Sequence, residues 1–406
     1  MKVLQVNKYF FIKGGADRVF FDTIGMLKDR GCSVITLSTE HPDNCPADES
    51  NYFIKSPEIR DLSFIHKIGA IRRFISNPEA ARAIEAVIVK EKPDVAHLHN
   101  IFNGISLSIL PVLKKYHIPV VLMLHDARLI CPSSLFNLRG TLCANCRKSF
   151  FLNCALHKCY QNSRLYSLMC AMEMFHKDFC FNYDQYISRY IFVSRAYRNF
   201  HCARHSFFKN KSDILYNSTA IQERQGENIR GDYFLFCGRV TEEKGIKTLV
   251  RAFQGKKAHL KVAGTGPLTA SLKEEAGTNV EFLGFLSGTA LADAIRGASF
   301  IVVPSEWEEN NPLSVIEAYS YGKPVIGSRI GGIPEIIDEG HTGYTFTAFD
   351  REDLSRVIDE ASCISDEAYA EMSVAAASFA RQNFDRLAYC DKLIDIYRKA
   401  MQYENI

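Results

Sequence analysis

Two glutamates eight residues apart, in the stretch EENNPLSVIE, are the residues best placed for chemistry. Glu309 precedes an expected helix at 312–321, and Glu317 lies on the second turn of that helix. The first-turn amides of Leu313 and Ser314 have no acceptor within the helix. Such amides bind phosphate, and carboxylates accept hydrogen bonds from hydroxyl groups. The stretch therefore offers, in order, a site for sugar hydroxyls, a site for a diphosphate and a site for ribose hydroxyls. A nucleotide sugar carries these groups in the same order.

The start of this helix follows from its residue types. Asn311 is expected as the N-cap, with Pro312 in the first turn. An alternative stays open, in which Glu309 and Glu317 are ordinary solvated acids. The placement of amides between two carboxylates favours the binding site over that alternative.

Two cations follow the apolar stretch YFLFC, in the loop GRVTEEKG. Arg239 is suited to grip a diphosphate through its planar guanidinium, and Lys244 acts as a compact point charge. On spacing alone, a pair of solvated surface cations explains this loop better. The diphosphate interpretation depends on the other loops.

Two loops in the first half of the chain carry weaker signals. Gly15 lies in KGGADR, where adjacent glycines before a helix let an anion approach the backbone. The pattern is not GxGxxG, so taken alone a tight turn is the better explanation. His125 ends an apolar stretch and is suited to hydrogen-bond or polarise a substrate group. A structural role fits a single histidine at least as well.

These loops all follow short apolar stretches that alternate with helix-length ones. Near-continuous apolar runs are typical of parallel strands buried on both faces. The expected strands are 2–7, 33–39, 94–99 and 119–124, then 233–237, 259–263, 280–283, 300–304 and 324–327. Helices are expected between them.

Two successive series of this kind predict an α/β protein with two doubly wound, Rossmann-like domains. The first is expected at 1–212 and the second at 213–384. Ligands of such sheets bind beyond the carboxyl ends of the strands, so the chemistry is expected in a cleft that both domains face.

Composition limits the partners and the cellular compartment that we expect for this chain. The formal charge of +3 is near neutral, and we expect no nucleic-acid partner. The first residues lack the layout of a signal peptide, and no run is long enough to span a bilayer. Thirteen cysteines without a secretion signal favour a reducing compartment, the cytoplasm.

A cysteine-rich stretch follows His125. Cys143 and Cys146 have the spacing of metal ligands, and Cys154 and Cys159 complete a set of four thiols. One interpretation is a structural zinc site that pins a long loop. The other, favoured on the irregular spacing, is a group of free thiols, with disulfides a third choice.

Basic residues gather in the same region, with twelve Lys or Arg and three acids between Arg139 and Lys211. The stretch 65–75 adds apolar residues at helical spacing beside three cations. A helix lying on a membrane surface has this pattern, as does a helix packed on its own domain, which is more common. Contact with the inner face of the membrane, through a lipid-linked acceptor, is one interpretation; a solvated basic face is the other.

Together these motifs resemble the retaining glycosyltransferases of the GT-B fold, in particular glycosyltransferase family 4 (GT4). GGADR resembles the family's GGAER loop, HLHN and LHD its strand ends, and FVSRAYRNF with LYNS its segment crossing between domains. GRVTEEKG, KVAGTGPL, VEFLGFLS and GGIPEIIDEGHTG follow in family order, and the two glutamates have the E-x7-E spacing. The ordered set covers almost the whole chain.

The resemblance implies roles for the donor-binding residues. Arg239 and Lys244 would neutralise the diphosphate, and Glu317 would bind the ribose. Glu309 would contact the donor sugar and its developing positive charge. The family often has E-P-x-G where this chain has Glu309-Asn310-Asn311-Pro312, so the sugar hydroxyls recognised there are open.

For the first domain, the resemblance implies that the Gly15 amide lies near the β-phosphate or the acceptor. His125 would hydrogen-bond the donor sugar. The helix 385–406 would return to pack on the first domain.

The implied activity is hexosyl transfer with retention of configuration and without a catalytic metal, in surface polysaccharide or glycoconjugate synthesis. The sequence contains no Asp-x-Asp to hold a divalent ion, which agrees with that activity. Rival interpretations are a sugar-nucleotide epimerase, a phosphorylase or a non-catalytic binding protein. A transferase differs from them in needing an acceptor to release nucleoside diphosphate efficiently.

Overall fold

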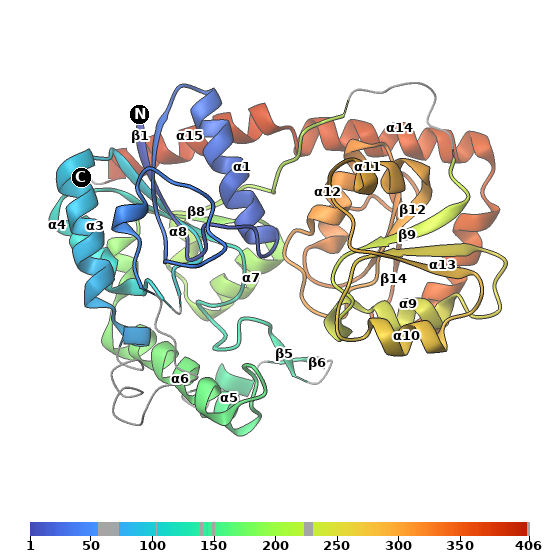
Figure 1. Ribbon diagram of the computed structural model, residues 1–406, viewed down its shortest axis with the longest axis horizontal. Helices are drawn as coiled ribbons and strands as arrows, with labels where there is room; N and C mark the ends of the chain where they lie inside the picture. The colour runs from blue at the N-terminus through green and yellow to red at the C-terminus, as the bar shows by residue number, and fades with distance from the viewer. Residues whose placement is uncertain are drawn as a thin grey trace. The chain divides into compact units, whose positions relative to one another are not determined.

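The computed structural model describes residues 1–55, 73–102, 104–138, 141–143, 145–147, 151–222 and 230–403. Its chain divides into two compact units (Figure 1). Unit 1 contains Met1–Leu138, Cys143–Leu215 and Leu387–Ile406, and unit 2 contains Tyr216–Arg386 with the short piece Arg139–Leu142. The chain thus leaves unit 1 after Leu215 and returns at Leu387, where the sequence placed these boundaries after 212 and 384.

Unit 1 is built on a six-stranded parallel sheet with the order β2-β1-β3-β4-β7-β8. Its central strands are fully buried, which explains their near-continuous apolar sequences. The strands are β1 (Lys2–Val6), β2 (Ser33–Leu37), β3 (Val95–Leu98), β4 (Val120–Leu124), β7 (Arg189–Phe192) and β8 (Ser212–Ile214). Two short strands, β5 (Asn137–Leu138) and β6 (Thr141–Leu142), precede β7 in the chain. The sequence predicted the first four strands of the sheet and missed β7 and β8.

Helices accompany this sheet, and some of them begin at polar side-chain caps. The Asn77 side chain accepts from the amides of Glu79 and Ala80, and the Ser194 hydroxyl accepts from the amide of Tyr197. The helices are α1 (Gly15–Asp29), α3 (Pro78–Glu91), α4 (Leu110–Lys115), α5 (Leu152–Leu156), α6 (Arg164–Phe175), α7 (Arg195–Arg204), α8 (Phe208–Lys211) and α15 (Arg386–Tyr403).

The segment FVSRAYRNF does not cross between the units. Its Phe192 ends β7 and its remaining residues lead into α7, inside unit 1. The crossing comes later, within LYNS, after Leu215.

Unit 2 repeats the plan, with the strand order β11-β10-β9-β12-β13-β14, all parallel. The strands are β9 (Tyr233–Cys237), β10 (His259–Ala263), β11 (Val280–Gly284), β12 (Ala298–Val303), β13 (Val325–Ser328) and β14 (Gly343–Phe346). The helices are α9 (Ile246–Ala252), α10 (Thr269–Glu275), α11 (Gly288–Gly297), α12 (Leu313–Ser320), α13 (Arg351–Cys363) and α14 (Asp366–Asn383).

Alternation along β9 explains how unit 2 divides its core between the two faces of the sheet. Phe234 and Phe236 belong to the apolar cluster of α9 and α13, whereas Tyr233 and Leu235 belong to the cluster of α12 and α14. Successive side chains of a strand point to opposite faces, so a strand covered on both sides is apolar at every position.

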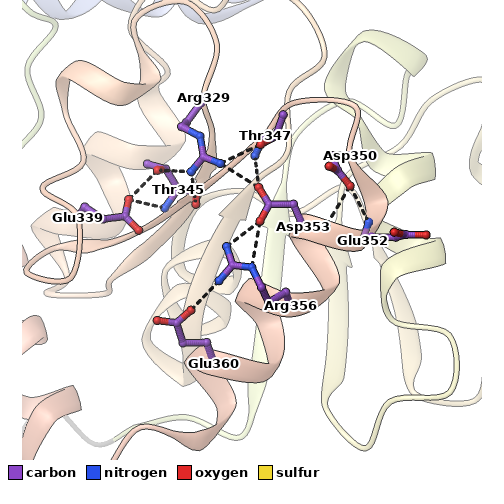
Figure 2. A network of polar contacts seen from close by, with 9 residues as sticks. All are labelled: Arg329, Glu339, Thr345, Thr347, Asp350, Glu352, Asp353, Arg356 and Glu360. Atoms are coloured by element: carbon purple, nitrogen blue, oxygen red, sulfur yellow. Dashed lines mark hydrogen bonds and ion pairs between the residues drawn. The ribbon is translucent and has the colours of Figure 1, made fainter.

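Polar contacts fasten β14 to α13 at the edge of this sheet (Figure 2). Arg329 donates to the Thr345 carbonyl oxygen at 2.9 Å and to Asp353 Oδ2 at 2.9 Å. Asp353 also accepts from the Thr347 amide at 2.7 Å and from Arg356 Nη2 at 2.6 Å. Burial alone would raise the pKa of Asp353, but these hydrogen bonds and the Arg356 charge lower it to about 2.

We expect Asp353→Asn to lower the free energy of unfolding at neutral pH by about 1–2 kcal/mol, because several hydrogen bonds to a charged acceptor are weakened. The folded-state pKa is depressed, so the ionised carboxylate stabilises the fold above its unfolded pKa of about 3.9. That stabilisation is lost as the pH falls toward about 2.

Chemical denaturation at several pH values measures this effect. Asp359→Asn is the matched control, since Asp359 is 66% exposed and has one ion pair, with Lys256. Equal losses in the two variants would contradict the structural role of Asp353.

No helix in the described ranges is both long and apolar enough to cross a membrane.

Candidate functional site

The strand order of unit 2 reverses between β9 and β12, which are neighbours in the sheet. In a doubly wound sheet the loops that leave such neighbours diverge and open a binding crevice at their carboxyl ends. The loop after β9 carries Arg239 and Lys244, and the loop after β12 carries Glu309. The topology therefore brings these three residues to one end of the sheet.

Lys244 and Glu309 form a direct ion pair at this position. Lys244 Nζ lies 2.6 Å from Glu309 Oε1, which also accepts from the Ser305 hydroxyl at 2.7 Å. The Glu309 side chain is 9% exposed and the Lys244 side chain 22%. Burial alone would raise the pKa of Glu309, but the Lys244 ammonium and its hydrogen bond hold it below the ordinary value.

Two glycines allow backbone segments to approach this pair closely. Gly331 has a φ of +58°, and a Cβ atom at this position would lie only 2.1 Å from the Glu309 carbonyl oxygen. That same oxygen accepts from the Gly332 amide at 2.7 Å. Gly245, with φ +66°, lies against the Pro304 carbonyl oxygen in the same way. The position of Glu309 thus depends on GGIPE, the motif that follows β13.

We expect Gly331→Ala to lower the free energy of unfolding by about 2–4 kcal/mol and to reduce activity strongly. The added Cβ would displace the Glu309 backbone, in addition to the cost of a positive φ. Gly255→Ala is the control, because Gly255 has φ +75° and open space around its Cβ position. Thermal melting of both variants measures the difference, and equal losses would contradict a special contact at Gly331.

The start of α12 differs from the expectation. The helix begins at Leu313 and its N-cap is Pro312, in extended conformation, so the prediction of Asn311 as N-cap is wrong. The Asn311 side chain instead accepts from the Asn217 amide at 2.7 Å, and the Asn311 carbonyl oxygen accepts from Asn217 Nδ2 at 3.0 Å. Asn311 Nδ2 is buried and has no hydrogen-bond partner within the described part of the chain.

The other two predicted donor residues lie around the same loops. Arg239 is 64% exposed at its side chain and lies 3.3 Å from Glu243. Glu317 lies in the second turn of α12 and is half-buried. Burial and the Glu317 charge raise the pKa of Cys237, the last residue of β9, to about 12. Glu317 therefore faces the end of β9, whereas Arg239 extends toward solvent.

Unit 1 has its own switch point, between β1 and β3. Asn7, directly after β1, donates to Asp17 Oδ1 at 3.0 Å and accepts from the Asn100 amide at 3.2 Å. Asp17 accepts in turn from the Gly14 amide at 3.1 Å. Gly15 is the first residue of α1 and is exposed. Asn7 and Asp17, which the sequence did not single out, fix the loop that carries Gly15.

A chain of buried polar side chains leads from His125 into the unit 1 sheet. His125 Nε2 lies 2.9 Å from His99 Nδ1, and His99 Nε2 lies 3.0 Å from Gln5 Oε1. Gln5 Nε2 lies 3.2 Å from both His97 Nδ1 and the Tyr397 hydroxyl of α15. His97 and Tyr397 are themselves 2.7 Å apart. We name this set, Gln5, His97, His99, His125 and Tyr397, the histidine chain.

The histidines of this chain are neutral at ordinary pH. Burial lowers the pKa of His125 to about 4, and burial and the His125 charge lower that of His97 to about 3. Burial and the two neighbouring histidines lower the pKa of His99 as well. A neutral His125 has one donor and one acceptor nitrogen, and its bond to His99 determines which is which. His125 is thus a fixed hydrogen-bonding group rather than a cation.

The sequence contained a signal for these residues. His97 lies in β3, His99 directly follows that strand, and Gln5 pairs with His97 in the sheet register. Polar side chains in or directly after buried strands need partners, which predicts a network. Only His125 was chosen, because it ends its strand.

A second cluster that the sequence missed follows β1. Lys13 Nζ lies 3.2 Å from the Tyr9 hydroxyl, and Lys8 Nζ lies 5.1 Å from the centroid of the Tyr9 ring. Burial alone would raise the pKa of Tyr9, but Lys8 and Lys13 lower it. The loop that carries Gly15 is therefore positively charged.

The structure does not support the predicted zinc site. Among the described residues, no three His, Cys, Asp or Glu side chains are grouped so that they could hold a metal ion. All thirteen cysteines are free thiols. Burial and the neighbouring Cys131, Cys143 and Cys159 raise the pKa of Cys146 to about 12. Cys154 is buried, at 1% exposure.

The predicted membrane-surface helix at 65–75 lies outside the described residues except for 73–75. Phe74 in that remainder is buried against Met169 and Cys170 of α6.

Comparison with known proteins identifies the family. The family models "Glycosyltransferase Family 4" and "Glycosyl transferases group 1" match residues 13–222 and 217–379. An uncharacterized 42.6 kDa protein in the cps region of Klebsiella pneumoniae is 28% identical over 64% of this chain and 64% of its own length. The chain therefore matches slightly less than two thirds of that relative.

Solved structures share the fold. A glycosyltransferase from Rickettsia africae superposes with a TM-score of 0.70 at 16% identity, covering 99% of this chain and 98% of that one. HepE of Anabaena, solved with UDP and glucose, superposes with a TM-score of 0.65 at 16% identity, covering 97% and 98%. The two parallel sheets and these matches define the GT-B fold. The chain belongs to glycosyltransferase family 4, within the group 1 glycosyltransferases.

Proposed function

We propose that the protein transfers a hexosyl group from a nucleoside-diphosphate sugar to a hydroxyl of a glycan or lipid-linked acceptor. The observation that carries this proposal is the partly buried Lys244–Glu309 pair, in the loops that precede α9 and α12 at the switch point of unit 2. In the reaction the bond from the anomeric carbon to the diphosphate oxygen breaks and a bond to the acceptor oxygen forms. The acceptor hydroxyl gives its proton to the departing diphosphate, which leaves as nucleoside diphosphate.

Unit 2 is proposed to bind the donor. The amides of Leu313 and Ser314 begin α12 and have no intrahelical acceptors, so they suit a diphosphate. Asn311 Nδ2 is a buried donor without a partner in the described residues, and a phosphate or sugar oxygen would satisfy it. Lys244 and the exposed Arg239 supply positive charge, and Glu317 is the proposed ribose contact.

Glu309 is proposed to act on the sugar itself. Its ionised carboxylate is held by Lys244 and Ser305 with little exposure to water, where an electrostatic interaction is strong. Such a carboxylate stabilises positive charge that develops at the anomeric carbon in the transition state. Retention of configuration and independence of a catalytic metal are part of the proposal and rest on the family resemblance.

Unit 1 is proposed to receive the acceptor. His125 supplies a neutral hydrogen-bonding group for a sugar hydroxyl, and Gly15 lies in a positively charged loop beside Lys13. HepE of Anabaena, whose fold this chain shares, was solved with UDP and glucose, which supports a nucleotide-sugar donor for this chain. A cytoplasmic location, with peripheral contact at the inner face of the membrane, fits a lipid-linked acceptor.

The test is a product assay with a nucleotide-sugar panel and a glycan acceptor extract. We expect nucleoside diphosphate release that depends on acceptor, together with a retained anomeric configuration in the product by NMR. Release without acceptor, or isomerisation of the donor sugar, would instead indicate a hydrolase or an epimerase. Dependence on orthophosphate would indicate a phosphorylase.

A further inference from the structure

The helices α5 and α6 follow one another in unit 1 (Figure 1). This hairpin exposes a stripe of large apolar side chains. On α6, Leu165, Leu168, Met172 and Phe175 are 45%, 40%, 44% and 40% exposed. Their spacing places them within an arc of about 80° on a helix that turns 100° per residue. Phe179, in the one-turn π-helix that continues α6, is 56% exposed.

The opposite side of α6 is the packed one. Met169, Cys170 and Met174 are each 1% exposed. Phe74 packs against the first two of these. The fold of unit 1 therefore uses one face of α6 for its core, and the exposed apolar stripe is a second face. The neighbouring helix α5 adds Leu152 and Leu156, one turn apart and 55% and 69% exposed. We name the seven exposed residues the apolar stripe: Leu152, Leu156, Leu165, Leu168, Met172, Phe175 and Phe179.

The charged residues around the apolar stripe indicate which kind of partner this surface binds. The stretch 151–181 contains two acids, and both are buried in ion pairs: Glu173 with Arg128 at 3.0 Å and Asp178 with Arg204 at 3.0 Å. The cations Lys158 and Arg164 are exposed. The hairpin thus presents apolar side chains and positive charge, and within the described residues it presents no exposed carboxylate.

We propose that the apolar stripe is a docking surface for an anionic lipid bilayer. Apolar side chains enter the boundary between headgroups and acyl chains, while nearby cations are attracted to anionic headgroups. Seven large apolar side chains gathered on one hairpin also differ from the singly scattered apolar residues of an ordinary protein surface. The purpose of docking, access to a lipid-linked acceptor, rests on the proposed function, but lipid binding itself does not.

The experiment measures co-sedimentation of the full chain with vesicles. One set contains phosphatidylglycerol and phosphatidylethanolamine in equal parts, and the other contains phosphatidylcholine alone. We expect binding to the anionic set that weakens with added salt, and little binding to the neutral set. The variant Leu165→Ser, Leu168→Ser, Met172→Ser should bind the anionic vesicles about tenfold or more weakly, because three side chains lose their transfer into lipid.

The matched control is Val89→Ser, Val374→Ser, Leu387→Ser, three apolar side chains outside the hairpin that are 57%, 49% and 61% exposed. This control should bind vesicles like the unchanged protein. All six positions are exposed, so both variants should keep the circular dichroism spectrum and melting transition. A Lys158→Gln, Arg164→Gln variant should also weaken binding, and only to anionic vesicles.

Three results would overturn the proposal. The first is no binding of the unchanged protein to anionic vesicles, and the second is equal binding by the serine variant. The third is a dimer, by light scattering, that the serine variant abolishes without any vesicle binding; the stripe would then join two copies of the chain. Calorimetric donor binding, which the serine variant should retain, reports separately on the proposed function.

Discussion

Replacing Glu309 with glutamine is expected to lower kcat by roughly two to three orders of magnitude while the donor still binds. The amide keeps the shape of the carboxylate and can still accept from the Ser305 hydroxyl, which now lies 2.7 Å from Oε1. It lacks the negative charge that would oppose developing positive charge on the sugar. An interaction that strengthens only in the transition state lowers turnover when removed, and leaves the Michaelis constant nearly unchanged.

Glu317→Gln is the matched control, since it changes the other carboxylate of the same stretch. Its proposed ribose contact is similar in the ground and transition states, so its loss should mostly raise the donor Michaelis constant. Steady-state kinetics over a range of donor concentrations separates the two defects. A pure binding defect in both variants would contradict the order of sugar, diphosphate and ribose along α12.

Replacing His99 with phenylalanine should affect both stability and turnover. Gln5 and His125 each lose a buried partner, which costs roughly 2–4 kcal/mol of unfolding free energy. His125 also loses the contact that fixes its donor and acceptor nitrogens. Groups that orient metal-binding histidines contribute about 10- to 100-fold to affinity or activity, and by analogy we expect kcat to fall by about that factor.

The pH dependence of the free energy of unfolding tests whether the histidine chain causes the loss of stability in His99→Phe. The folded-state pKa values of His97 and His125 are depressed to about 3 and about 4, whereas an unfolded histidine titrates near 6.5. The unfolded chain then binds more protons between these values, so stability is fully present above about pH 6.5 and falls as the pH drops. We expect His99→Phe to reduce this acid slope, since one titrating group is removed.

Tyr397→Phe provides a graded comparison at the far end of the histidine chain. It removes one hydroxyl, 2.7 Å from His97, and leaves the His99–His125 contact in place. Stability should fall by about 1 kcal/mol, with little change in kcat. Urea unfolding from pH 5 to 8, with kcat measured in parallel, tests both variants. An unchanged acid slope in His99→Phe, or an equal loss of kcat in Tyr397→Phe, would contradict this account.

The sequence predicted most strands because a strand buried on both faces consists almost entirely of apolar residues. Strands such as β4 and β12 are covered on both faces and are apolar throughout. β8 was missed because it lies at the edge of its sheet, is half-buried and consists of Ser-Asp-Ile. β7 begins with an arginine, Arg189, whose partner Asp213 lies on β8, so neither polar residue suggests a strand by itself.

The sequence named the residues of the candidate site but gave no sign of how they pair. Glu309 and Lys244 were each chosen from their own loop, yet 65 positions separate them, and no local pattern indicates their ion pair. The two residues meet because β9 and β12, which their loops follow, are neighbours at the switch point of the sheet. Asn311 was wrongly expected to cap α12 because cap preference describes an isolated helix, whereas in the fold its side chain accepts from the amide of Asn217, 94 positions away. Tyr397 lies 300 positions from His97, so only the fold reveals their contact.

Unit 2 is expected to bind a nucleoside-diphosphate sugar through Lys244 and the start of α12. The most direct test is the melting temperature of the protein with a panel of UDP-, GDP-, ADP- and dTDP-sugars, alone and in the variant Lys244→Met. A ligand that binds only the folded state raises the melting temperature by mass action. At least one nucleotide sugar should stabilise the unchanged protein, and Lys244→Met should weaken that donor roughly ten- to hundredfold. Stabilisation by none of the panel, or equal stabilisation of the variant, would contradict the account.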